Sequence, residues 1–161
     1  MKNFGFLLML ISGLLPAQNF TKQDSLKGSD TSLRNFWDVK KYEISVEPHF
    51  EEKSVSGTNK IIFEITKDVT NPTFQIDLQQ PMNYRIINSE EKWWSSRRDG
   101  DFIFIETKKN YKKGETHSFT IQFFGNPTIA KNAPWDGGWV FTKDKNNDPW
   151  ISVAQEGIGA S

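Results

Sequence analysis

The chain has 161 residues, which is enough for one all-β domain and too few for two large ones. It carries 20 Lys and Arg against 20 Asp and Glu, so binding to nucleic acid or to an anionic membrane surface is not expected. The absence of cysteine excludes disulfides, a thiol nucleophile and cysteine-ligated metals. The aromatic share of 14% exceeds the needs of one small core and indicates a large buried interface or a binding surface.

Residues 1–17 resemble a secretory signal peptide, with a lysine near the start, an apolar run and Ala17 as a cleavage position. The apolar run is too short to span a bilayer comfortably. We therefore expect an exported protein, located in the periplasm, at the cell surface or outside the cell, with no stable membrane span after cleavage. Residues 18–35 are polar and lack periodicity, which predicts a poorly ordered linker.

The stretch 39–65 predicts two antiparallel strands around which the rest of the chain is organised. Apolar and polar side chains alternate with a period of two in both halves, and a polar turn at 49–53 separates the halves. The first half is expected to bury one face, which carries Tyr42, Ile44, Val46 and Phe50. Gly57 stands where an inward side chain is expected and indicates a bulge or a close approach by another backbone.

Further strands are predicted at 74–78, 84–87, 91–98, 101–107, 119–123, 140–142 and 150–154. The dipeptide Asp99-Gly100 predicts a two-residue hairpin turn. Residues 102–105 are apolar on both faces, so their strand should be central and covered on both sides, with Phe104 in the core. No segment shows a helical period, and the expected fold class is therefore all-β, an antiparallel β-sandwich-like domain.

The sequence carries no self-contained catalytic centre. HExxH, GxSxG and Gly-rich phosphate loops are all absent, and the two histidines, His49 and His117, are remote from each other. Neither histidine is assigned a role, and we expect this chain to bind no metal or other cofactor.

Tryptophans are the other residues that invite a functional interpretation. Trp93 and Trp94 are adjacent in a predicted strand and face opposite sides, so they cannot form one sugar-binding platform. Trp135, Trp139 and Trp150 cluster in a loop-rich region, which predicts a satellite core beneath that loop.

Six short motifs between Phe36 and the end of the chain are fairly specific as a set, through their order and spacing. They are WDV at 37–39, YEISVEP at 42–48, SGT at 56–58, FFGNP at 123–127, APWDGG at 133–138 and QEGIGAS at 155–161. Together they resemble the N-terminal β domain of zinc aminopeptidases of the aminopeptidase N family. The organisation expected from this resemblance is a signal peptide at 1–17, a polar linker at 18–35 and the β domain, truncated at its end, at 36–161.

The resemblance implies a saddle-shaped β domain placed before a thermolysin-like zinc domain, in an exported enzyme that removes N-terminal residues from peptides. The zinc-binding HExxH helix of such an enzyme would lie outside this chain. The chain's partners are then its own missing catalytic domain, with zinc as that domain's cofactor, and the N-terminus of a peptide substrate.

The resemblance also implies a substrate-binding residue. In the family, an acidic or amide side chain of this domain binds the free α-amino group of the substrate. Glu156 matches that position best and Gln155 is the alternative. A carboxylate suits this task because it accepts charge-assisted hydrogen bonds from an ammonium group.

A second class of function is left open by the sequence, namely a secreted β-sandwich binding module for carbohydrate or protein, with the Trp-rich loop as its site. The coding sequence that follows Ser161 distinguishes the two hypotheses. The first predicts HExxH there, and the second predicts a stop codon or an unrelated linker.

Overall fold

A computed structural model of the chain describes residues 21–87, 95–133 and 135–154. The elements are α1 (Lys22–Gly28), β1 (Trp37–His49), β2 (Ser54–Ile65), β3 (Val69–Thr70), β4 (Thr73–Asp77), β5 (Asn83–Ile87), β6 (Ser95–Asp99), β7 (Phe102–Glu106), β8 (Asn110–Tyr111), β9 (Thr116–Gly125), β10 (Gly138–Lys143) and β11 (Pro149–Ala154). The predicted all-β class is confirmed.

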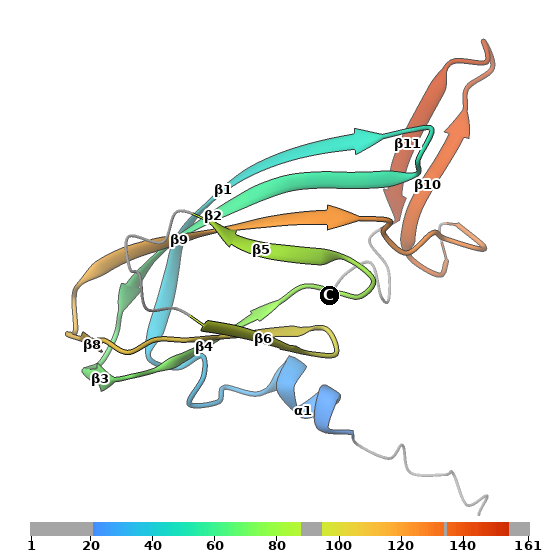
Figure 1. The fold of residues 1–161 in the computed structure, drawn as a ribbon. Coiled ribbons are helices and arrows are strands. Elements are labelled where there is room, and N and C mark those ends of the chain that lie inside the picture. The colour runs from blue at the N-terminus through green and yellow to red at the C-terminus, as the bar shows by residue number, and fades with distance from the viewer. Residues whose placement is uncertain (1–20, 88–94, 134, 155–161) are drawn as a thin grey trace, which may run out of the picture.

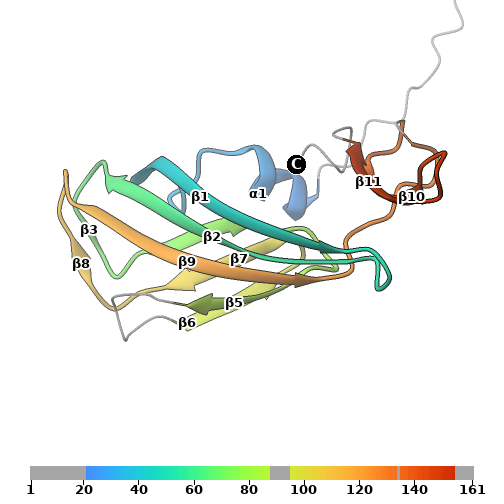
Figure 2. The same ribbon diagram turned by 90° about the horizontal axis from the view of Figure 1, so that it is seen from above.

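Two antiparallel sheets form the body of the molecule (Figures 1 and 2). The larger sheet has the strand order β1-β2-β9-β5, and the smaller has the order β4-β7-β6. Two further ladders, β3 with β8 and β10 with β11, contain two strands each. Figure 1 shows that the β10–β11 hairpin projects from one end of the sandwich, whereas α1 lies beside the smaller sheet.

The core lies between the facing sides of the two sheets and is rich in aromatic rings. Phe74 on β4 occupies its centre and is fully buried. Its ring centroid lies 4.9–5.9 Å from five other rings, in edge-to-face arrangements, namely those of Phe36, Trp37, Phe63, Tyr111 and Phe119. Such arrangements stabilise aromatic pairs beyond the area they bury. Much of the aromatic surplus of the sequence is therefore found in the core.

The prediction that the strand at 102–105 is central and covered on both sides is confirmed. β7 lies between β4 and β6, and all four of these residues are buried. Ile103 and Ile105 belong to the main core, whereas Phe104 is buried beneath the Arg97 guanidinium, which lies 4.2 Å from its ring centroid. The β6–β7 turn has two residues as predicted, but they are Gly100 and Asp101, because Asp99 pairs with Phe102.

The central pair of strands is antiparallel as predicted, and its register places Val46 opposite Gly57. The ladder is regular at Gly57, so the bulge alternative is wrong there; the irregularity of β1 lies between Val39 and Lys41. The close-approach alternative is confirmed, because a Cβ atom on Gly57 would overlap the Ser45 carbonyl oxygen and approach the Phe123 ring to 2.6 Å.

The prediction that β1 buries its apolar face is wrong for the middle of the strand. Tyr42, Ile44 and Val46 are 55%, 60% and 48% exposed. β1 is an edge strand of the larger sheet, and only its beginning, through Trp37 and Val39, packs against the core. The alternation is consistent with pairing to β2, but burial depends on whether another layer covers the strand.

The expectation of an irregular linker at 18–35 is corrected over residues 22–28, which form α1. The sequence around Thr21 explains the helix. The Thr21 hydroxyl accepts a hydrogen bond from the Asp24 amide at 3.2 Å, and the Asp24 carboxylate accepts one from the Thr21 amide at 2.8 Å. This capping box satisfies two amide groups at the helix start, a local signal that does not need an apolar stripe.

Candidate functional site

The two substrate-binding candidates, Gln155 and Glu156, lie outside the described residues, as do Trp93 and Trp94. The strand β11 ends at Ala154, directly before Gln155. The β10–β11 hairpin is therefore the element that leads into this segment of the chain, and its geometry is described first.

The β10–β11 hairpin is a regular antiparallel ladder that pairs Gly138 with Ala154 at its base and Lys143 with Pro149 at its tip. At the tip, the Asp144 carboxylate accepts hydrogen bonds from the amides of Asn146 and Asp148 at 2.8 and 2.9 Å. These bonds replace the ladder contacts that end at the turn, as an Asx-type turn does.

The tryptophans around this hairpin do not form the predicted satellite core. Trp135 is 78% exposed and Trp150 is 57% exposed. Trp139 is half-buried and stacks on Phe141, with ring centroids 5.9 Å apart. The three tryptophans therefore share no common cluster, and two of their indoles are presented to solvent.

The loop before the hairpin is organised by Asp136. Its Oδ2 atom accepts hydrogen bonds from the amides of Lys131 and Asn132 at 2.6 and 2.8 Å. These amide donors, Asn132 first, hold the pKa of Asp136 below its ordinary value, because they favour the charged carboxylate. The Trp135 amide is also bonded, to the Asn132 carbonyl at 2.9 Å. The exposed indole thus stands on a fixed backbone turn.

Both histidines have ordinary polar partners. His49 Nε2 lies 3.0 Å from Ser56 Oγ, and His117 Nε2 lies 3.0 Å from a Glu115 carboxylate oxygen. The His117 side chain is 16% exposed, and its ring packs edge-on against Tyr111. Over the described ranges, no three His, Cys, Asp or Glu side chains are grouped so that they could hold a metal ion.

A groove of about 540 Å³ opens between the edges of the two sheets, beside β1 and β4. Sequence analysis did not identify it. Its lining residues come from the segment before β1 and from β1, β2 and β4, and they are Arg34, Trp37, Asp38, Val39, Tyr42, Ile44, Asn59, Ile61, Gln75, Ile76 and Asp77. The groove exists because β1 extends the larger sheet beyond the edge of the smaller one, so that the inner face near β1 is left uncovered.

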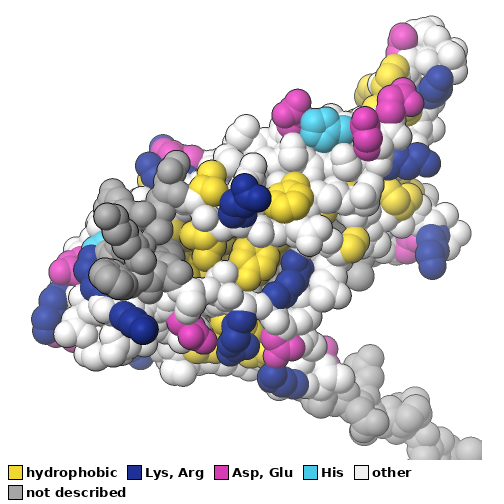
Figure 3. All heavy atoms as spheres, viewed as in Figure 1, with side chains coloured by type: hydrophobic (Ala, Val, Ile, Leu, Met, Phe, Trp, Pro, Cys, Tyr) yellow, Lys and Arg dark blue, Asp and Glu magenta, His cyan; other side chains and the backbone are white. Residues whose placement is uncertain are grey.

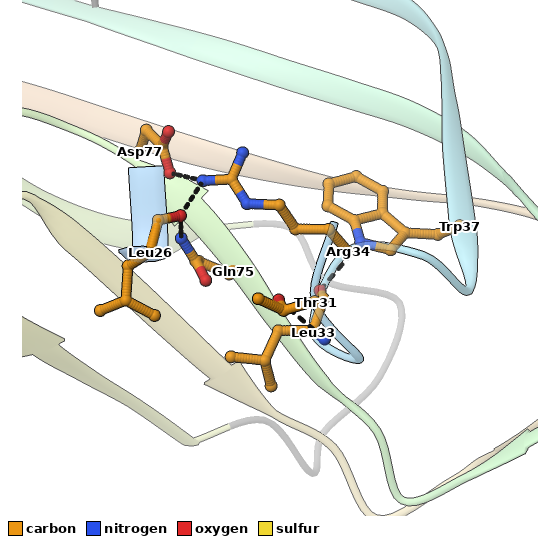
Figure 4. A network of polar contacts seen from close by, with 7 residues as sticks. All are labelled: Leu26, Thr31, Leu33, Arg34, Trp37, Gln75 and Asp77. Atoms are coloured by element: carbon orange, nitrogen blue, oxygen red, sulfur yellow. Dashed lines mark hydrogen bonds and ion pairs between the residues drawn. The ribbon is translucent and has the colours of Figure 1, made fainter. Parts of the chain in front are cut away.

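Figure 4 shows the polar wall of this groove. The Arg34 guanidinium donates to Asp77 at 2.6 Å and to the Leu26 carbonyl at 3.2 Å. The Gln75 amide donates to the same carbonyl at 2.9 Å. Trp37 donates from its indole nitrogen to the Leu33 carbonyl at 3.2 Å. The segment from α1 to β1 is thereby attached to β4, and the groove wall is held by several directed bonds.

Three polar atoms of groove-lining residues are buried and have no hydrogen-bond partner: Arg34 Nε, Asn59 Oδ1 and Gln75 Oε1. Gln75 is only 2% exposed. Buried polar atoms are satisfied in the great majority of cases, and leaving one unpaired costs about 1–3 kcal/mol. One buried donor and two buried acceptors without partners therefore belong to the residues that line this groove.

The surface charge fits the balanced composition. Figure 3 shows Lys and Arg side chains interspersed with Asp and Glu over the face that it presents, with hydrophobic side chains gathered near its middle. Among the described residues, no helix is long and apolar enough to cross a membrane. No family model matches the chain, and no curated protein matches its sequence.

Proposed function

We propose that this chain is the β domain of an exported zinc aminopeptidase, in which it scaffolds a catalytic domain and helps to bind the substrate's α-amino group. The observation that carries the proposal is the projecting β10–β11 hairpin. It presents the exposed indole of Trp150, follows a loop that presents that of Trp135, and ends directly before Gln155 and Glu156. Exposed tryptophans are enriched where another protein surface is to be covered.

In this proposal the hairpin positions the chain segment that carries the amine-binding side chain. A two-stranded ladder is a stiffer support than a free loop, because its backbone groups pair across the strands. Glu156 then accepts hydrogen bonds from the ammonium group of the substrate, and zinc, held by the catalytic domain, supplies the hydrolytic chemistry. A carboxylate distinguishes a free chain end from an internal peptide bond because only the former carries a positive charge.

Glu156→Ala in the whole enzyme is expected to lower kcat/KM for peptides with a free amino terminus by about ten- to a hundredfold, as losing a hydrogen bond to a charged group of about 1.5–3 kcal/mol implies. The measurement is steady-state hydrolysis of an aminoacyl reporter. Ser152→Ala, on an exposed position of β11, is the control and should leave the kinetics unchanged.

Gln155→Ala decides between the two neighbouring candidates. If Gln155→Ala lowers kcat/KM and Glu156→Ala does not, Gln155 rather than Glu156 binds the amine. Wild-type kinetics in both variants would mean that the amine is held by another residue. Failure of the full-length protein to bind zinc or to release N-terminal residues would contradict the proposal as a whole.

A second candidate function is supported by the groove between the sheets, as a site of a secreted carbohydrate-binding module. A sugar hydroxyl both donates and accepts, so it can bond to Asn59 Oδ1 and to Arg34 Nε once these side chains turn toward the groove, because both atoms are buried and lack partners. Tyr42 is 55% exposed at the groove and offers an aromatic face to a sugar ring.

Asn59→Leu is expected to weaken oligosaccharide binding about tenfold, since it removes one buried acceptor from the groove. Isothermal titration of the 161-residue chain with a panel of soluble oligosaccharides measures this. Thr58→Val, the neighbouring position on the other face of β2, should bind like the wild type. Absence of binding across the panel, or equal binding by both variants, would rule out this second candidate.

A further inference from the structure

β1 is the longest edge strand in the described part of the chain, and only β2 pairs with it there. An open strand edge presents unpaired N–H and C=O groups that can pair with another strand. Its three exposed apolar residues, Tyr42, Ile44 and Val46, stand in one row beside that edge. A partner strand must therefore match both the free backbone groups of this edge and its apolar row.

The direction of the free backbone groups follows from Gly57. A Cβ atom on Gly57 would overlap the Ser45 carbonyl oxygen, so that carbonyl points toward β2. Carbonyl directions alternate along a strand, so those of Ile44 and Val46 point to the open edge. Pro48 has the same parity, and its missing N–H then also lies at the open edge, where proline is tolerated.

The usable length of the edge is set by two features of β1. The ladder is irregular between Val39 and Lys41, and Pro48 cannot donate a hydrogen bond. The regular stretch between them is 41–47, and Ile44 is its central residue. A two-fold axis at Ile44 therefore uses the whole stretch, with neither the irregularity nor the proline inside the new ladder.

We propose that β1 pairs with β1 of a second copy of this chain, antiparallel, with Ile44 opposite Ile44. In this register Tyr42 lies opposite Val46 of the second copy, and these two residues have their backbone groups directed outward. The apolar rows of the two copies lie on the same face and become one continuous row. The contact is self-complementary, as a two-fold interface must be.

The charges on the other face select this register. Ile44 opposite Ile44 places Lys41 opposite Glu47 twice. Lys41 lies 2.8 Å from Glu43 of its own strand, but its side chain is 62% exposed and can also contact Glu47 of the second copy. Glu47 has no ion-pair partner among the described residues. Sliding the second copy by two residues in one direction places Glu43 opposite Glu43, and in the other direction Glu43 opposite Glu47. Like charges directly opposite each other destabilise a strand pair.

Cysteine cross-linking tests the register, because the chain has no cysteine of its own. Opposed residues of a hydrogen-bonded pair have Cα atoms about 5.5 Å apart, within the range of a disulfide. Ile44→Cys should therefore give a covalent dimer on mild oxidation. Val46→Cys is the matched control on the same exposed row, since the two Val46 residues would be separated by roughly 13 Å along the strands. No cross-link with Ile44→Cys, or an equal one with Val46→Cys, would overturn the proposal.

A charge exchange tests the pairing by a second measurement, sedimentation equilibrium of the 161-residue chain. Lys41→Glu and Glu47→Lys should each raise the dimer Kd about tenfold or more, because each converts both attractive pairs into repulsive ones. The double variant K41E/E47K should restore the wild-type Kd. Lys108→Glu changes the net charge by the same amount at an exposed position outside β1, and it should leave the dimer Kd unchanged. A monomeric wild-type chain, or a double variant as weak as the singles, would contradict the proposal.

Discussion

Phe74→Ala is expected to lower the free energy of unfolding by about 3–5 kcal/mol, the range for removing a large aromatic side chain from a packed core. Phe74 is fully buried on β4, and its ring contacts rings from the larger sheet, from β8 and from the segment before β1. Its removal leaves a cavity that no single neighbour can fill, since the surrounding rings are held by their own contacts.

Urea denaturation followed by tryptophan fluorescence measures this effect. Phe74→Leu fills part of the space and should cost distinctly less than the alanine variant. Phe124→Ala is the control for the residue type, because Phe124 is 38% exposed on β9 and loses fewer contacts on truncation. An unchanged denaturation midpoint for Phe74→Ala would mean that the two sheets do not close on this ring.

The sequence predicts most strands of this fold because their alternation is local information. β4 and β9 each alternate apolar and polar side chains and are bounded by turn residues, and both lie where the pattern places them. β7 is apolar on both faces, and it is the central strand of its sheet. In these elements the residue pattern and the final environment agree, as is usual in a consistently folded chain.

β1 and α1 show where such reasoning fails, for two different physical reasons. The alternation of β1 is as regular as that of β4, but the second sheet does not extend beneath its middle, and local sequence carries no information on that. α1 is a short helix fixed by a capping box at Thr21 and by Lys22, whose amino group lies 2.5 Å from Asp99. A search for apolar periodicity cannot find a helix of this kind.

The candidate groove was missed because its polar residues are far apart in the sequence. Arg34 lies in the segment read as a linker, Asn59 in the middle of β2, and Gln75 at an alternating position of β4. Each side chain is unremarkable in its own segment, and only the packing of the sheets brings the three together. Gln155 and Glu156, by contrast, come from a motif in one continuous stretch, and their role stays a prediction.

Gly57→Ala is expected to lower the free energy of unfolding by about 3 kcal/mol, the upper end of the range for forcing extra atoms into a packed site. The sign is the reverse of the usual one, because alanine normally stabilises a strand relative to glycine by about 0.5–1 kcal/mol. Here the added methyl group would overlap the Ser45 carbonyl oxygen of the paired strand. A backbone atom in a ladder cannot rotate away, so the contact can be relieved only by moving β1 and β2 apart.

The Phe123 ring makes the same position tight from the other side, since its nearest carbon would lie 2.6 Å from the new methyl group. Lys60→Ala, at an exposed position of the same strand, is the control for alanine in β2 and should change the stability by less than about 0.5 kcal/mol. Urea denaturation of both variants gives the comparison. If Gly57→Ala were as stable as the wild type or more so, the β1–β2 ladder would have to open at Gly57 without cost. The close approach of Ser45 would then not be what requires glycine there.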